Sequence, residues 1–231
     1  FETAGGRNLM RLDAEVRVAD ALSDGHDADW YPVIDFAFPA GAGFQMGKRY
    51  EARMTFVVKE IPVALELVID PAEEDTIMVN GTPLSSSRTD MIWDPSNVLY
   101  DLSEHVRPGD NTIIVRSRIP AWAAQHPPLF AVLRGAFGLD ADRALIAKPD
   151  TVQVPGSWSD QGFPDLSGVA VYRRMVHVSA AEAAGRAALA VGGSPDAMEL
   201  WCNGQYVGSS LWNPHRFDVT GRLSAGVNEL E

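Results

Sequence analysis

Aromatic and polar side chains between residues 158 and 216 of this 231-residue chain are of types that could hold a sugar ring. Flat aromatic faces cover the apolar C–H face of a sugar, while nearby polar side chains hydrogen-bond its hydroxyl groups. The candidates lie in loops or at outward strand positions: Trp158, Trp201, Trp212, His215 and Arg216. The alternative for the three tryptophans is packing against a neighbouring domain, and the sequence leaves both interpretations open.

Other chemistries lack a recognisable pattern. The five histidines show no paired spacing of the kind that zinc sites use, and no G-x-S-x-G nucleophile motif occurs. The single cysteine, Cys202, occupies an inward strand position and excludes an internal disulfide. Asp101 and Asp218 occupy equivalent places in two similar segments, which favours a shared strand-end hydrogen bond over catalysis. No catalytic residue is nominated.

Composition and charge exclude several classes of partner. The net charge of −12 argues against binding to nucleic acid or to an anionic membrane, because phosphate binding needs clustered Lys and Arg. No apolar run is long enough to span a bilayer. With 46% hydrophobic and 22% charged residues, the chain is expected to be globular.

An internal duplication organises the chain. Residues 198–202 alternate in polarity and run into Asn203-Gly204, which is the strongest short signal for a β-hairpin. The same arrangement ends in Asn80-Gly81, and Trp93 stands where Trp212 stands. The segments 100–103 and 108–111 likewise match 217–220 and 225–228. The pattern predicts two copies of one unit.

The elements that position these residues are expected to be almost all strands. Residues 50–58 and 63–69 alternate with period two, whereas residues 180–184 allow only one helical turn before Gly185. We therefore predict two tandem antiparallel β-sandwiches, at residues 1–148 and 149–231, with a boundary near Lys148-Pro149. The second is expected to be truncated at its last strand, leaving an open sheet edge that favours self-association. The abrupt start and end also suggest a piece of a longer protein.

Several short phrases occur in a fixed order along the chain. They are Pro155-Gly156-Ser157-Trp158, Gln161-Gly162-Phe163-Pro164, Ser167-Gly168, Tyr172-Arg173-Arg174 and Trp201-x-Asn203-Gly204. This order resembles the sugar-binding jelly-roll domain of glycoside hydrolase family 2. The stretch 201–231, with segments 8–13 and 128–139, is still more similar to the tandem C-terminal sandwiches of bacterial α-L-rhamnosidase-like enzymes of family 106 and relatives. Gly135-Ala136-Phe137 departs from the Gly-Asp-Phe often found in them.

The resemblance implies two galactose-binding-like sandwiches from the non-catalytic region of a bacterial glycoside hydrolase. Such enzymes keep their catalytic carboxylates in a separate barrel domain. The expected partners of this chain are therefore the catalytic barrel of the parent chain and carbohydrate. The chain by itself is expected to be inactive. A plant or bacterial polysaccharide substrate would suit a secreted or periplasmic parent. No cofactor is expected, and a structural calcium, which the fold class allows, has no nominated ligands. The alternatives are a stand-alone carbohydrate-binding module and the sugar-binding domain of a family 2 β-galactosidase-like or β-glucuronidase-like enzyme.

Overall fold

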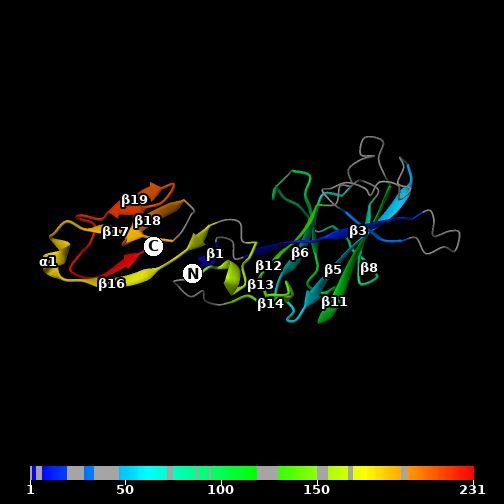
Figure 1. Ribbon diagram of the computed structural model, residues 1–231, viewed down its shortest axis with the longest axis horizontal. Helices are drawn as coiled ribbons and strands as arrows, with labels where there is room; N and C mark the ends of the chain where they lie inside the picture. Colours follow the sequence, from blue (N-terminus) through cyan, green and yellow to red (C-terminus); the bar gives the residue numbers. More distant parts are fainter. Residues whose placement is uncertain are drawn as a thin grey trace. The chain divides into compact units, whose positions relative to one another are not determined.

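Two compact units make up the computed structural model, in which residues 2–3, 7–19, 29–33, 47–71, 75–86, 88–93, 95–118, 130–149, 156–165, 169–193 and 197–231 are described. The first unit comprises Gly5–Ser167, and the second comprises Gly168–Glu231 together with Phe1–Ala4. Regular structure in both units is nearly all β-strand (Figure 1). The expected all-β fold is confirmed.

The first unit is a sandwich of two sheets. Its strands are β2 (Asn8–Arg11), β3 (Ala14–Val18), β4 (Tyr31–Pro32), β5 (Arg49–Val58), β6 (Leu65–Ile69), β7 (Thr76–Val79), β8 (Thr82–Pro83), β9 (Arg88–Thr89), β10 (Val98–Asp101), β11 (Gly109–Arg118), β12 (Ala131–Gly135), β13 (Phe137–Leu139) and β14 (Leu145–Ala147). One sheet has the order β2-β12-β6-β10-β9. The other has the order β13-β14-β5-β11-β7-β8, and β3 pairs with both β4 and β5. The described pairings are antiparallel except that of β14 with β5.

The core of the first unit lies between these two sheets. Alternate residues of β5, such as Met54 and Phe56, meet Leu65 and Leu67 of β6 in one continuous hydrophobic cluster. Their side chains are between 0% and 4% exposed, as the period-two pattern of the two segments predicts.

The second unit is smaller. Its elements are β1 (Glu2–Thr3), β15 (Ala170–Val171), β16 (Arg174–Val178), α1 (Ala180–Ala183), β17 (Ala188–Val191), β18 (Met198–Cys202), β19 (Gln205–Ser210), β20 (His215–Asp218) and β21 (Gly226–Leu230). A sheet of order β16-β21-β18-β19 faces the pair β17-β20, and β1 pairs with β15. Leu200 of β18 and Phe217 of β20 meet in the core.

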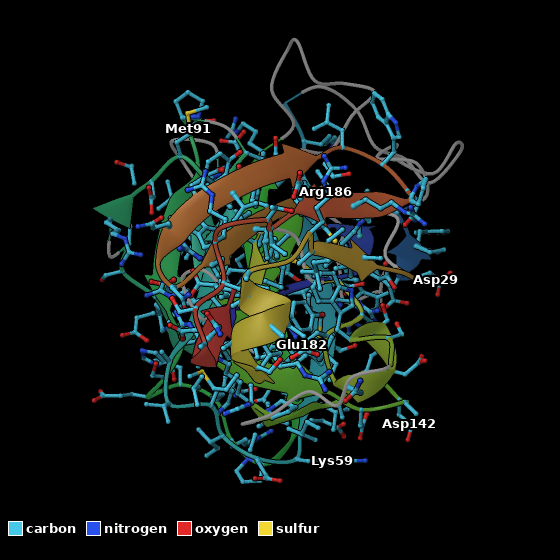
Figure 2. The ribbon with its side chains drawn as sticks, turned by 90° about the vertical axis from the view of Figure 1, so that its left-hand side faces the viewer. Asp29, Lys59, Met91, Asp142, Glu182 and Arg186 are labelled. Carbon is cyan, nitrogen blue, oxygen red and sulfur yellow. The ribbon has the colours of Figure 1, made fainter. Side chains whose placement is uncertain are left out.

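The helical turn expected at residues 180–184 forms as α1, Ala180–Ala183. Ser179 accepts a hydrogen bond from the backbone of Glu182, and the Glu182 carboxylate accepts one from the backbone of Ser179. Glu182 therefore lies in the first turn of α1, where this reciprocal capping box satisfies two backbone donors (Figure 2).

Both Asn-Gly hairpins are confirmed. Asn80 and Gly81 have φ angles of 49° and 86°, and Asn203 and Gly204 have φ angles of 51° and 73°. A two-residue turn with positive φ at both positions matches the right-handed twist of the strands that it joins. The turns join β7 to β8 and β18 to β19.

A pair of asparagines locks each hairpin to a neighbouring strand. In the first unit, Asn80 Nδ2 donates to Asn111 Oδ1 at 2.8 Å, and the backbone N–H of Thr112 donates to Asn80 Oδ1 at 3.1 Å. Asn111 is fully buried and also accepts from the backbone N–H of Arg107 while donating to the carbonyls of Arg107 and Gly109. One side chain thus holds a whole turn.

The second unit repeats this lock. Asn203 Nδ2 donates to Asn228 Oδ1 at 2.9 Å, and the backbone N–H of Glu229 donates to Asn203 Oδ1 at 2.9 Å. The buried Asn228 in turn accepts from the backbone of Ser224 and donates to the carbonyls of Ser224 and Gly226. The two segments that match in sequence therefore make equivalent hydrogen bonds, each within its own unit.

The division between the units falls after Ser167 rather than near Lys148-Pro149. The segment around Phe163 belongs to the first unit because Phe163 is buried and the carbonyl of Gly162 accepts hydrogen bonds from Leu139 N and Asn8 Nδ2. The segment that was expected to begin the second copy is therefore the end of the first unit. Pro155, Ser167 and Gly168, which belong to the short phrases in the sequence, lie outside the described residues.

The last strand is not an open edge, contrary to expectation. β21 lies between β16 and β18, and the backbone groups of Glu231 exchange hydrogen bonds with Trp201. The Asn203–Asn228 contact fixes this position, because it ties the hairpin of β18 to the start of β21.

Replacing Asn111 with Ala should lower the free energy of unfolding by about 3 kcal/mol, because the backbone groups of Arg107 and Gly109 lose the fully buried side chain to which they bond. Urea denaturation at neutral pH measures the change. Asp110→Ala, at the exposed neighbouring position, is the matched control and should have little effect. An Asn111→Ala variant as stable as that control would contradict the proposed role of the lock.

Candidate functional site

The five candidate residues are divided between the two units. Trp158 belongs to the first unit, and the other four belong to the second. Trp158 is half-buried beside the 3₁₀-helix Ser159–Gln161, and its carbonyl accepts hydrogen bonds from Gln161 N at 2.9 Å and Phe163 N at 3.0 Å. Its backbone therefore closes a turn.

His215 is buried and is not part of the surface that a ligand could contact. Its side chain is 0% exposed, and its Nδ1 lies 2.9 Å from the Ser210 hydroxyl. It faces inward because it is in phase with Phe217 on β20, and that side of β20 packs against the core. A ligand on the surface of the second unit cannot reach its ring.

Trp201 and Arg216 point away from each other. The neighbours of Trp201 on β18, Leu200 and Cys202, are buried, and Phe217 beside Arg216 on β20 is buried as well. Since Leu200 and Phe217 meet in one core, Trp201 and Arg216 lie on opposite outer faces of the sandwich. No single flat ligand spans both.

Trp212 occupies the turn between β19 and β20 and is 72% exposed. The Ser210 hydroxyl donates to its carbonyl at 3.3 Å. Its equivalent in the first unit, Trp93, is 38% exposed and packs edge-on against Phe130 with ring centroids 4.8 Å apart. Trp212 is thus the more accessible of two equivalent tryptophans.

A second aromatic side chain accompanies Trp201. Tyr206 lies opposite Trp201 across the β18-β19 hairpin, with ring centroids 5.2 Å apart and an interplanar angle of 62°. Tyr206 is 49% exposed. The sequence contains the signal for this pair, because a two-residue turn at Asn203-Gly204 places residues 201 and 206 opposite each other.

Polar side chains lie next to Trp201 on the side of the sheet away from Tyr206. The backbones of Trp201 and Glu231 exchange hydrogen bonds of 2.8 and 3.0 Å, so Glu231 is the next residue across the sheet. Arg173 Nε donates to Glu231 Oε2 at 2.6 Å, and both side chains remain partly exposed. The row therefore presents two aromatic rings, a carboxylate and a guanidinium in sequence. We call these four residues, Tyr206, Trp201, Glu231 and Arg173, the aromatic row.

The equivalent face of the first unit is chemically different. Met78 and Pro83 take the places of Trp201 and Tyr206, because they are partners across the first Asn-Gly hairpin. The same sheet face carries a charged ladder in which Arg17 and Arg116 both bind Glu51. Burial would raise the pKa of Glu51, but the hydrogen bonds from Arg116 and Arg17 hold it below its ordinary value.

Asp101 and Asp218 have the strand-end role expected of them. Asp101 Oδ1 accepts from the backbone of Ser103 at 2.9 Å, and Asp218 Oδ1 accepts from the backbone of Thr220 at 2.9 Å. These bonds hold the pKa of both carboxyl groups below the ordinary value: for Asp101 mainly the Ser103 backbone, for Asp218 first the Thr220 hydroxyl.

Within the described ranges, no group of three or more His, Cys, Asp or Glu side chains is arranged to hold a metal ion. Cys202 is buried, and burial raises the pKa of its thiol. In the same parts of the chain, no helix is long and apolar enough to cross a membrane.

Neither a protein-family model nor a curated protein matches the chain. Solved structures of β-glucuronidase from Ruminococcus gnavus are similar in fold. The complex with uronic deoxynojirimycin has 10% identity and a TM-score of 0.41, with 93% of this chain and 39% of that chain covered. Another structure of the enzyme has 12% identity and a TM-score of 0.40, with coverages of 96% and 39%. The chain spans well under half the length of these enzymes.

Replacing Thr220 with Val should raise the pKa of Asp218 toward the ordinary 3.8, because the hydroxyl donor is lost while the backbone donor remains. Thr220→Ser keeps the hydroxyl and serves as the control. Because the folded pKa is depressed, this bond's contribution to stability is present above the unfolded pKa and is lost as pH falls through the folded pKa. NMR titration measures both. A pKa of Asp218 above 3.8, as a general acid would need, would contradict the structural role.

Proposed function

We propose that the chain is a non-catalytic, sugar-binding-like region of a bacterial glycoside hydrolase, with a rhamnosidase-like parent acting on plant or bacterial polysaccharide. Support comes from residues 201–231, 8–13 and 128–139, which resemble the tandem sandwiches of those enzymes, and from the all-β fold of both units. Asp101 and Asp218, the repeated carboxylates, serve as turn caps, which supports a non-catalytic role.

The aromatic row carries the proposal. Trp201 is half-buried and Tyr206 is 49% exposed, so the row offers a rigid apolar surface to a ligand. A pyranose ring laid on this surface would cover it with C–H groups, and its hydroxyls would meet Glu231 and Arg173. The first unit lacks this surface, since Met78 and Pro83 stand in place of the two rings.

A second role is packing against a catalytic barrel of the parent enzyme. The same outer sheet face carries Met175 and Val227, each 62% exposed, on the neighbouring strands β16 and β21. Apolar side chains of this size on a sheet face favour contact with another protein surface. In this alternative, the two units buttress the barrel and the aromatic row forms a wall beside its active site.

Two alternatives to a rhamnosidase-like parent are open. The chain is either a stand-alone carbohydrate-binding module or the sugar-binding domain of a family 2 enzyme of the β-galactosidase or β-glucuronidase type. The aromatic row would serve the same contact in each. Independent binding of sugar by this chain favours the module, and the order of barrel and sandwiches in the parent gene separates the two enzyme families.

Trp201→Ala should weaken binding of rhamnose-rich or galactose-rich oligosaccharides by at least about tenfold, which corresponds to about 1.4 kcal/mol. Tyr206→Ala should weaken it as well, and its exposure makes a folding defect improbable. Isothermal titration calorimetry of the chain against a panel of these glycans measures the affinity.

Trp212→Ala is the matched control, because it removes an exposed tryptophan of the same unit outside the row. Binding that survives Trp201→Ala but is lost in Trp212→Ala would place the sugar at the turn and overturn the assignment to the row. Absence of binding across the panel would favour the barrel-packing role.

A further inference from the structure

The central strand of one sheet in the first unit is paired on both edges. β6 pairs with β10 on one side and β12 on the other. Glu66 and Val68 stand opposite Arg134 and Val132 of β12. The inward residues of β12, which include Leu133, complete the core cluster on that side.

β17 is the equivalent of β6 in the second unit. The backbone N–H of Leu102 donates to the Leu65 carbonyl at 2.8 Å, and the backbone N–H of Val219 donates to the Ala187 carbonyl at 3.0 Å in the same way. Asp101 faces Glu66 as Asp218 faces Ala188. By this register, Ala188 and Ala190 occupy the positions that pair with β12 in the first unit.

This edge of β17 has no partner among the residues that the structure describes, where β17 pairs with β20 alone. Successive residues of a strand direct their N–H and C=O groups to opposite edges. Because Ala187 bonds toward β20, the backbone groups of Ala188 and Ala190 point to the other side. Both side chains are exposed, and Leu189 and Val191 toward the core remain only half-buried.

The chemistry of this edge favours a further strand. Natural edge strands are usually protected by charged side chains, proline or a bulge, whereas β17 is Ala-Leu-Ala-Val and its pairing with β20 is regular. The strand itself carries no charged residue: Arg186 precedes it (Figure 2), and Asp218 and Arg216 stand opposite Ala188 and Ala190 on the paired strand β20. Within the described ranges, β16 pairs with β21 alone at the edge of the other sheet, and it carries Arg174 and His177.

We propose that the open edge of β17 accepts one antiparallel strand from a partner polypeptide segment, patterned like β12 with apolar residues at alternate positions. Its backbone would bond to Ala188 and Ala190, and its inward side chains would cover Leu189 and Val191. The occupant is a partner segment rather than a second copy, because two copies each carry a net charge of −12 and repel. The inference is independent of sugar binding.

Amide hydrogen exchange of the chain, read by NMR with a synthetic peptide of the sequence of residues 130–136 as the probe, tests the proposal. In the free chain, the amides of Ala188 and Ala190 should exchange fast and those of Glu66 and Val68 slowly. Millimolar peptide should slow exchange at Ala188 and Ala190 by at least about tenfold, with little change at Leu189, which bonds toward β20.

Ala190→Pro removes one N–H donor of the open edge and should abolish the effect of the peptide, whereas Ala190→Ser keeps the donor and should preserve it. Unchanged exchange at saturating peptide would overturn the proposal, as would equal protection in Ala190→Pro. Protection in the free chain that rises with protein concentration, together with a dimer mass in sedimentation, would instead assign the edge to a second copy.

Discussion

A buried asparagine in each unit fixes how the hairpin, the following turn and the next strand meet. Asn111 and Asn228 use both ends of the side-chain amide, so each satisfies a turn of backbone and also receives the hairpin asparagine. A buried amide with a missing partner is costly, so the arrangement forms as a whole or not at all. The lock sets the register of β7 on β11 and of β18 on β21, and every outward side chain of those strands depends on that register.

The two units apply the same lock to different surfaces. In the first unit, Arg17 and Arg53 lie 4.4 and 4.3 Å over the Trp30 ring while binding Glu51 and Glu15, so the outer face is filled by charges paired within the chain. In the second unit, the corresponding strands present Trp201 and Tyr206 beside one ion pair. A duplicated scaffold whose internal hydrogen bonds are kept and whose outer face has changed is what separate roles for the two copies would produce.

The sequence predicts the local features because their causes are local. Asn-Gly requires a specific turn, alternation defines strand faces, and the repeated aspartates cap strand ends, so the hairpins, the all-β fold and the roles of Asp101 and Asp218 follow. The burial of His215 also follows from the sequence, since His215 and Phe217 are two residues apart on one strand and face the same side. The division after Ser167 does not follow from the sequence, because it depends on long-range hydrogen bonds such as that from Asn8 to Gly162. Strand order likewise depends on contacts between distant segments, and it places β21 inside its sheet.

The hydrophobic core of the second unit is smaller than that of the first. In the first unit, inward residues of β6, β10 and β12 join one large cluster with those of β5 and β11. In the second, Leu200, Phe217 and Val219 form the buried cluster, and Leu189, Met198 and Val207 around it are only partly covered. Hydrophobic stabilisation scales with the apolar area removed from water, so an additional strand beside β17 would gain stability both from its backbone bonds and from the side chains that it covers. The two-stranded sheet is therefore where a further strand would add stability to the second unit.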